Sequence, residues 1–368
     1  MRKASVDRVF LTTVLILVLA GFGIYFSATL GLVARETVSV FSIVFNHIVL
    51  GMILGLCSLW YFSRFPYRNL RKYAFIIFIV SFILTLLVFV PGLGLEYGGA
   101  KRWINLGFAT FQPSEFLKLG YIIYLAAWLS SVRDKVKEWN YGFLPFFILS
   151  ALVGVVLLLE PDTDSYALIF LAGAAMFLVA GARKRHLFAL FGVGVVVLVG
   201  MAFLKPYIMQ RFITFLDPSS DPRGAGYQIQ QSLIAIGSGG ATGRGFGQSV
   251  QKFNYLPEPI GDSIFAVAAE EFGFVGSVLL VLLYVAFALR GLRIAARAPD
   301  LFGGLIVLGI VILIVTQSFV NIAAMLGILP LSGLPLIFVS HGGTALFFAL
   351  TEVGIVLNVS RSIKKINV

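Results

Sequence analysis

The sequence has few charged residues and almost no cysteine. Only 12% of its 368 residues are charged and 59% are hydrophobic, with a mean hydropathy of +0.97. This composition excludes an ordinary soluble domain and indicates an integral membrane protein. The single cysteine, Cys57, excludes an intramolecular disulfide and a cysteine-based metal site. The three histidines, His47, His186 and His341, lack the spacing of zinc ligands.

Ten apolar runs are long enough to cross a membrane as helices. They lie near residues 9–29, 41–62, 73–91, 113–131, 143–159, 164–181, 187–204, 262–289, 302–327 and 334–359. The sequence therefore predicts one all-α membrane domain over residues 1–368. Two connections are long, 92–112 and 205–261, and long connections in a compact domain usually have a function.

Acidic residues are scarcer than basic ones, 17 against 28, which gives a net charge of +11. Most basic residues gather in alternate connections: Arg2, Lys3, Arg8; Arg64, Arg68, Arg71, Lys72; Arg133, Lys135, Lys137; Arg183, Lys184, Arg185; Arg290, Arg293, Arg297; Arg361, Lys364, Lys365. Because Lys and Arg accumulate on the cytoplasmic side, this pattern predicts that both termini are cytoplasmic and both long connections are outside. We interpret the excess charge as topology and contact with anionic membrane lipids, and expect no nucleic-acid partner.

Asp262 is the leading candidate for chemistry. It opens the eighth apolar run, directly behind a polar, glycine-rich stretch. An acid is costly to keep at such a position, so it is a candidate for a functional residue. At 100° per residue, Glu270 lies on its side of the predicted helix and Glu271 on the opposite side. Two roles remain open for Asp262, a helix cap after Gly261 or a catalytic base.

Lys101 and Arg102 lie in the outer segment 92–112, against the positive-inside trend. One explanation is a clamp for phosphate or pyrophosphate groups, which bind Arg and Lys. The other is anchoring at the membrane interface beside Trp103.

Pro113 favours a helix start, and Glu115 and Lys118 follow in its first turns. Their spacing predicts an i,i+3 ion pair that faces the bundle interior. Such a pair either binds substrate or holds helices together.

The EPDTDS turn, residues 160–165, places Glu160, Asp162 and Asp164 between two spans. Carboxylates of this kind are suitable ligands for Mg²⁺ or Mn²⁺. Turn formation and capping of the next helix are the alternative explanation.

The outer segment 205–261 contains an amphipathic stretch, Tyr227 to Gly237, which predicts a short interfacial or re-entrant helix. The glycines that follow lack the strand context of a nucleotide-binding loop, but they permit close approach of the backbone. Arg244 and Lys252 place two cations beside them.

Ser340, His341, Gly342 and Gly343 interrupt the last apolar run. Paired glycines usually permit close helix contact. His341 is either a proton carrier or a hydrogen-bond partner. Glu352, deeper in the same run, predicts a buried partner.

Six segments, in this order along nearly the whole chain, resemble the SEDS family, the FtsW, RodA and SpoVE proteins of bacterial cell-wall synthesis. They are GAKRWINLG, QPSEFLKL, EPD, QSLIAIGSGGATGRGFGQSVQK, NYLPEPIGDSIFAVAAEEFGFVG and GLPLIFVSHGGTALFFALTEVGIVLNVSR. The DPSSDPRGAGYQ and GQSVQK segments are more similar to the FtsW and SpoVE branch than to RodA.

The resemblance implies a peptidoglycan glycosyltransferase of the bacterial cytoplasmic membrane that polymerises lipid II at the outer face, in cell division or shape maintenance. It implies a class B penicillin-binding protein and other division or elongation proteins as partners. It identifies Asp262 with the family's essential acid. The family's other important polar positions match Lys101, Arg102, Glu115, Lys118, Glu160, Asp162, Gln231, Ser232, Lys252, Ser340, Gly342 and Gly343. Arg244 and His341 are added as substrate-site candidates by their positions, Mg²⁺ or Mn²⁺ is a candidate cofactor, and no nucleotide or redox cofactor is expected.

Two positions depart from the family pattern, because His341 replaces the usual Tyr and Gly261 the usual Thr before the essential acid. The main alternative function is a flippase for lipid II or a similar polyprenyl-linked sugar, which would use the ionisable residues inside the spans. A non-catalytic scaffold for a division complex is the third.

Overall fold

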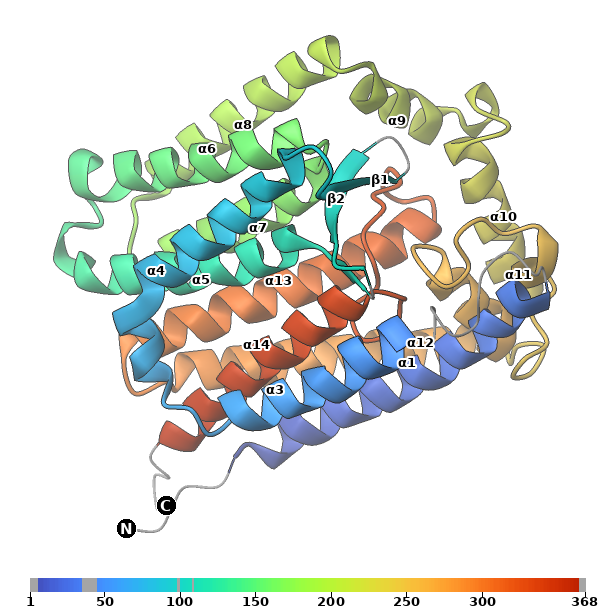
Figure 1. Cartoon of the computed structure of the whole chain (residues 1–368), viewed down its shortest axis with the longest axis horizontal. Helices are drawn as coiled ribbons and strands as arrows, with labels where there is room; N and C mark the ends of the chain where they lie inside the picture. Colours follow the sequence, from blue (N-terminus) through green and yellow to red (C-terminus); the bar gives the residue numbers. More distant parts are fainter. Residues whose placement is uncertain (1–5, 35–44, 98–99, 108, 364–368) are drawn as a thin grey trace.

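The computed structural model describes residues 6–34, 45–97, 100–107 and 109–363, which form a predominantly helical bundle (Figure 1). The long helices are α1 (Arg8–Ala34), α4 (Tyr67–Leu86), α5 (Pro113–Ser131), α6 (Leu144–Leu159), α7 (Thr163–Val179), α8 (Lys184–Leu204), α12 (Ile264–Ala296), α13 (Leu301–Met325) and α14 (Gly343–Ser362). Shorter helical segments are η1 (Phe45–Ile53), α3 (Leu54–Phe62), η2 (Leu87–Phe89), η3 (Arg133–Lys135), η4 (Trp139–Phe143), α9 (Pro206–Leu216), η5 (Pro218–Ser220), α10 (Ala225–Ser238) and α11 (Gln251–Asn254).

The apolar helices identify a multi-pass membrane protein. Within the described residues, 7 helical stretches are long and apolar enough to cross a membrane. Helices also cover the other predicted spans, with η1 and α3 in the second, α5 in the fourth and α7 in the sixth. Residues 41–44, the start of the second predicted span, lie outside the described residues. The count of ten spans and their orientation stay predictions.

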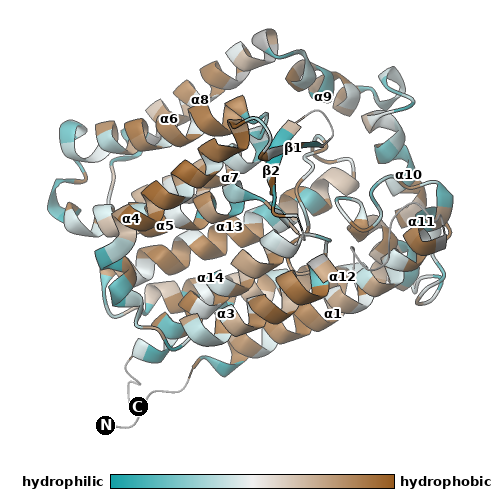
Figure 2. Cartoon of the chain, viewed as in Figure 1, coloured by the Kyte–Doolittle hydropathy of each residue, from teal (hydrophilic) through white to brown (hydrophobic). Residues whose placement is uncertain are grey.

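The two ends of the bundle differ. At one end the backbone N–H of Asp7, before α1, donates to Ser360 of α14 at 3.1 Å, and Asp7 pairs with Arg290 of α12 at 2.8 Å. The opposite end carries the short elements α9, α10 and α11 and the strands (Figure 1). Polar residues concentrate in the turns, whereas the helices are largely apolar (Figure 2). The beginning of α1 and the end of α14 therefore lie at the same end, as predicted for the termini.

The all-α prediction was incomplete, because the segment 92–112 contains a small antiparallel sheet. Its strands are β1 (Gly94–Tyr97), β2 (Ala100–Asn105) and β3 (Thr110–Phe111), in the order β1-β2-β3. Ala100 and Ile104 of β2 are buried while Lys101 is exposed, as the alternation of side chains in a strand requires. Strands this short carry too little periodicity to be distinguished from a loop in the sequence.

Three other features of the helices differ from the predictions. The eighth predicted span has a break at Gly273, whose φ of 65° and ψ of −165° are not helical, and α12 then continues to Ala296. The last predicted span begins in irregular backbone, because α14 starts only at Gly343. The segment 205–261 contains α9, which was not predicted, as well as α10, which confirms the predicted helix at Tyr227 to Gly237.

Candidate functional site

Asp262 lies in the turn of residues 258–263, the Asp262 loop, which leads into α12. Ser263, and not Asp262, occupies the N-cap position of α12, and the Ser263 side chain makes no capping hydrogen bond. This excludes the helix-cap role for Asp262. Glu258, a non-glycine residue at the start of this loop, has left-handed backbone at φ 46°. Such conformations are costly and cluster at functional sites.

The backbone of the Asp262 loop is held by two other parts of the chain. The carbonyl oxygens of residues 260–262 accept, in order, from the backbone N of His341, Oγ of Ser340 and Nδ2 of Asn321, at 2.7, 2.8 and 2.8 Å. Ser340 and His341 belong to the α13–α14 loop, residues 326–342, and Asn321 to α13. Because three consecutive carbonyls are bound, the position of the Asp262 backbone is well defined.

His341 contacts α1 with its ring. Its Nδ1 lies 3.2 Å from the hydroxyl of Tyr25, and Tyr25 stacks on His47 at 3.8 Å between ring centroids. Burial lowers the pKa of His341 to about 4, so the ring is neutral near pH 7. These contacts favour the hydrogen-bond role over that of a proton carrier.

The surroundings of Asp262 make it a stronger base than an ordinary carboxylate. Burial, followed by repulsion from Glu258 and Asp164, raises the pKa of Asp262 to about 6, although Arg211 and Arg102 act in the opposite direction. At neutral pH the carboxylate is therefore ionised and able to take up a proton.

Arg102 of β2 reaches the turn between α6 and α7. Its Nε donates to the carbonyl of Glu160 at 3.3 Å, and its Nη2 donates to the carbonyl of Pro161. Asp162 accepts from the backbone N of Ser165 at 3.3 Å, which confirms the capping prediction.

The carboxylates of this turn are only partly satisfied. Both side-chain oxygens of Glu160 and Oδ2 of Asp162 are buried and have no hydrogen-bond partner among the described residues. Burial, with added repulsion from Asp162, raises the pKa of Glu160 to about 9, while Arg102 partly offsets this. The cluster is completed by Arg211 of α9, which pairs with Asp164 at 2.8 Å. We name as the acidic cluster Arg102, Glu160, Asp162, Asp164, Arg211 and Asp262.

Lys101 does not join Arg102 in this cluster. Neighbouring residues of a strand point to opposite faces. Lys101 is exposed and lies 3.9 Å from Glu96, whereas Arg102 turns inward. The two predicted clamp residues therefore do not converge on one point, and their substrate role stays a prediction.

Glu115 and Lys118 of α5 form the predicted buried ion pair, with Lys118 Nζ 2.7 Å from Glu115 Oε1. Lys118 also donates to Oε1 of Gln317 on α13 at 2.9 Å. Glu352 of α14 is buried and interacts favourably with the charge of Lys118 and unfavourably with that of Glu115, so Lys118 is its buried partner.

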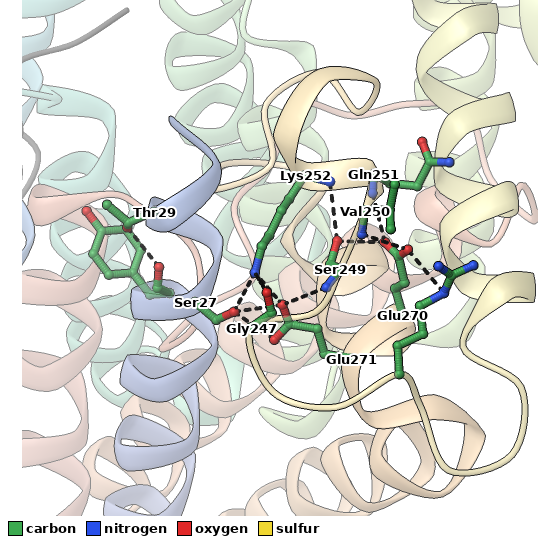
Figure 3. Close-up of polar contacts among 11 residues, drawn as sticks. Ser27, Thr29, Gly247, Ser249, Val250, Gln251, Lys252, Glu270 and Glu271 are labelled. Atoms are coloured by element: carbon green, nitrogen blue, oxygen red, sulfur yellow. Dashed lines mark hydrogen bonds and ion pairs between the residues drawn. The ribbon is translucent and has the colours of Figure 1, made fainter. Parts of the chain in front are cut away.

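Lys252 and Glu271 form a second buried ion pair (Figure 3). Their charged atoms are 2.6 Å apart, and both side chains are fully buried. Lys252 also donates to Ser27 of α1 and to the carbonyl of Gly247, each at 2.9 Å. The charge of Lys252, predicted to bind substrate, is thus already matched inside the protein, and its substrate role is untested.

Glu270 binds the same segment as Glu271. It accepts from Ser249 Oγ at 2.6 Å and from the backbone N of Val250 and Gln251 at 3.0 and 3.2 Å (Figure 3). Arg244, which is exposed, lies 3.5 Å from its carboxylate. We name as the anchoring cluster Ser27, Ser249, Lys252, Glu270 and Glu271.

The glycine-rich segment packs directly against the break in α12. Gly245 N donates to the carbonyl of Glu271 at 3.0 Å, and Phe274 N donates to that of Gly240 at 2.9 Å. A Cβ added at Gly243 would lie 2.1 Å from the carbonyl oxygen of Glu271. The glycines therefore permit the close backbone approach that the sequence predicted, and this segment satisfies backbone groups that the break exposes.

The remaining candidates lie in α10 and at the start of α14. Gln231 is half-buried, and Ser232 is buried with its hydroxyl 3.4 Å from the sulfur of Met325. Gly342 is the N-cap of α14. A Cβ added at Gly51 of η1 would lie 3.2 Å from Cα of Gly343, which confirms close helix contact at this glycine.

Sequence reasoning missed Gln317, Asn321 and Arg211. Gln317 and Asn321 are amides four residues apart in an otherwise apolar span, and this spacing was the available signal. Arg211 lies in α9, a helix that was not predicted.

Comparison with known proteins identifies the family of the chain. Residues 7–365 match the model of the FtsW, RodA and SpoVE family, described as cell cycle proteins. The chain is 38% identical over 308 residues to stage V sporulation protein E of Bacillus subtilis, covering 84% of each. It is 36% identical over 362 residues to a probable peptidoglycan glycosyltransferase FtsW of Geobacter sp., covering 98% of each.

Solved structures show the same fold. The crystal structure of the rod shape determining protein RodA of Thermus thermophilus has a TM-score of 0.71 and 27% identity, covering 98% of both chains. A chain from a peptidoglycan synthase complex, studied for the coordination of polymerization and crosslinking, has a TM-score of 0.76 and 29% identity, covering 94% of this chain and 97% of that one. The family match over almost the whole chain and the shared fold show that this protein belongs to the FtsW, RodA and SpoVE family.

Proposed function

We propose that this protein is a peptidoglycan glycosyltransferase that joins lipid II units into glycan strands at the outer face of the bacterial cytoplasmic membrane, in cell division or shape maintenance. The observation that carries the proposal is the Asp262 carboxylate on a fixed backbone, with a pKa of about 6, within electrostatic reach of Arg102 and Arg211. The names of the FtsW relatives support the same activity.

In this mechanism Asp262 acts as general base. It accepts the proton of the acceptor GlcNAc 4-hydroxyl while that oxygen attacks the anomeric carbon of the donor MurNAc. The bond from that carbon to the pyrophosphate oxygen breaks with inversion, and undecaprenyl pyrophosphate leaves with the bonding electrons. A pKa near 6 keeps the base ionised and basic at neutral pH.

The leaving group needs charge stabilisation more than a proton. Arg102 donates its hydrogen bonds to two neutral carbonyls, so its positive charge is still available to the pyrophosphate. Arg211 shares its charge with Asp164. We therefore place the pyrophosphate beside Arg102, with Arg211 in support.

A Mg²⁺ or Mn²⁺ ion is part of the proposal. Within the described residues no group of three or more His, Cys, Asp or Glu side chains is arranged to hold a metal. Glu160 and Asp162 nevertheless offer three buried, unpartnered carboxylate oxygens, which fit a hard cation that shares its remaining ligands with phosphate oxygens. When bound, the ion would neutralise charge on the leaving pyrophosphate.

A class B penicillin-binding protein is the proposed partner. The structural neighbour from a peptidoglycan synthase complex, in which polymerization and crosslinking are coordinated, supports this assignment. Crosslinking is the reaction that such a transpeptidase would add to glycan polymerisation.

The alternative function, a lipid II flippase, is favoured by the buried charges Glu115, Lys118 and Glu352.

The test of the proposed function is polymerisation of purified lipid II by the full chain in vesicles, without ATP or a proton gradient, with and without the transpeptidase. We expect wild type to form long glycans and Asp262→Asn to lose at least about 100-fold in rate. An Asp262→Asn protein that inserts normally and polymerises at the wild-type rate would sink the proposal, and lipid II transfer across the bilayer without any polymer would favour the flippase.

A further inference from the structure

Asn321 is a buried amide on α13 whose two N–H groups connect separate parts of the chain. Its Nδ2 donates to the carbonyl of Asp262 at 2.8 Å and to the carbonyl of Leu334 at 2.7 Å, and the side chain is 1% exposed. Both partners are acceptors only, so the amide is oriented with its nitrogen towards them. Each carbonyl belongs to irregular backbone, where it has no helical partner and needs a donor.

The second carbonyl belongs to Leu334, in a segment that lies against the Asp262 carboxylate. We call residues Gly333 and Leu334 the Gly333–Leu334 wall. Gly333, directly before Leu334, has left-handed backbone at φ 57°, and a Cβ added there would lie 3.6 Å from Asp262 Oδ2. By binding Leu334 and Asp262 together, Asn321 fixes the distance between this wall and the residue whose carboxylate it faces.

Gln317, one turn earlier on the same face of α13, extends the connection. Its Nε2 donates to the carbonyl of Pro335 at 3.3 Å, and its Oε1 accepts from Lys118 at 2.9 Å. The buried Glu115–Lys118 pair is thus tied to the same α13–α14 loop as Asp262. The two amides form one row of contacts from α5 to the Asp262 loop.

We propose that Asn321 is a positioning residue for the reaction, holding the Asp262 carboxylate against the Gly333–Leu334 wall at the distance and degree of burial that catalysis needs. The inference rests on the proposed function and adds a residue that acts through Asp262 without touching substrate. A displacement of about 1 Å in a catalytic group is enough to cost about 100-fold in rate.

The test compares Asn321→Leu, Asn321→Gln and Asn321→Ser with wild type in lipid II polymerisation by the full chain. We expect Asn321→Leu to lower kcat by roughly 10- to 100-fold with KM little changed. We expect Asn321→Gln, which keeps both donors, to recover part of the loss. If Asn321→Leu fails to insert, Asn321→Ser, whose hydroxyl can serve only one carbonyl at a time, carries the same comparison.

The pH profile separates positioning from a general loss of structure. Charged groups face Asp262 from four elements: Glu258 of its own loop, Asp164 of α7, Arg211 of α9 and Arg102 of β2. None of them changes in Asn321→Leu, yet a displaced wall admits water to the carboxylate. The midpoint of the kcat profile should therefore move below that of wild type, towards the ordinary value of an aspartate.

Asn358 of α14 provides the matched control. It is also a buried amide, 7% exposed, and bridges Ser63 and Tyr67 at the opposite end of the bundle. Asn358→Leu should reduce thermal stability and leave the kcat of the folded fraction and its pH midpoint unchanged. With Asp262→Asn inactive, either of two results would overturn the inference: a wild-type kcat and midpoint in Asn321→Leu, or an equal kcat loss in Asn358→Leu. An active Asp262→Asn would overturn the proposed function instead.

Discussion

Two buried polar clusters flank the first turns of α12, and they differ in how completely their charges are matched. In the anchoring cluster Lys252 and Glu271 are in direct contact, and Glu270 accepts three hydrogen bonds. In the acidic cluster both oxygens of Glu160 are unpartnered among the described residues, and the pKa of Asp262 is raised to about 6. A closed set of contacts stabilises a fold, whereas unmatched carboxylates keep capacity for a proton, a cation or a ligand.

The contrast changes which acids near the glycine-rich segment are candidates for chemistry. Glu270 and Glu271 are as buried as any acid in the described chain, but their charges are committed to residues 249–252. Asp262 keeps part of its surface exposed although protein surrounds its carboxyl, and its backbone is fixed while the carboxylate stays available. Burial alone therefore does not identify the catalytic acid, and the state of its partners does.

Breaking the anchoring cluster should have the largest effect on stability. Lys252→Met leaves the Glu271 carboxylate buried without its cation and should cost about 3 to 5 kcal/mol in the free energy of unfolding. Lys252→Met with Glu271→Gln should recover much of this, as measured by thermal melting in detergent. The double variant also tests the predicted substrate role of Lys252. If the double variant folds and polymerises lipid II normally, Lys252 has a structural role only. If it folds but is inactive, Lys252 has a role beyond the anchoring cluster.

The glycine contact at the helix break should come next. Gly243→Ala places a Cβ against the carbonyl of Glu271 in a left-handed position, φ 84°, and should cost at least about 2 kcal/mol. Gly237 is the control, because it lies inside α10 with open space at its Cβ position. Gly237→Ala should be neutral or stabilise by up to about 1 kcal/mol. Equal melting temperatures for the two variants would refute the close-packing role of the segment.

Asp262→Asn should stabilise the protein at high pH and not at low pH. The pKa of Asp262 is raised by folding, from 3.8 to about 6, so its ionisation destabilises the folded state as pH rises through this window. The variant should gain roughly 1 to 3 kcal/mol at pH 8 and almost nothing near pH 2.5, which lies below the pKa of both the folded and the unfolded state.

Asp300 gives the opposite sign and serves as the control for that measurement. Burial alone would raise its pKa, but hydrogen bonds from Tyr67 and the backbone N of Gly303 outweigh burial and lower it. Asp300→Asn should therefore lose stability at pH 8. A pH-independent difference between wild type and Asp262→Asn would show that the environment of Asp262 is not as described.

Glu160→Gln should have the smallest effect. With a pKa of about 9 the Glu160 carboxyl is protonated at pH 7, so the amide replaces a group of similar shape and equal charge. Without divalent cation the change in unfolding free energy should stay below about 1 kcal/mol. Glu271→Gln, measured beside it, should be far more damaging. Equal losses would remove the distinction between the two clusters.

Local sequence signals predicted much of the fold and part of the site. Pro113 marks the start of α5, Asp162 caps α7, and the spacing of Glu115 and Lys118 gave their ion pair. Each of these depends on residues within one helical turn. The apolar runs likewise located the long helices, because a helix that crosses a membrane needs a long run of apolar residues.

The contacts that build the site could not be predicted in the same way. Asn321 and Asp262 are 59 positions apart, and nothing local indicates that they meet. The break at Gly273 depends on the glycine-rich segment that packs into it, and the three strands stabilise one another across short ladders. These features arise from tertiary contacts, which override local periodicity.

The central claim is that Asp262 is a general base whose surroundings tune it for neutral pH. The most direct measurement is the kcat of lipid II polymerisation by wild type between pH 4.5 and 8, on protein shown to stay folded across the range. We expect kcat to rise about tenfold per pH unit below a midpoint near pH 6 and to level off above it, with no such rise in Asp262→Asn. A flat profile in wild type, or the same profile in Asp262→Asn, would contradict the account.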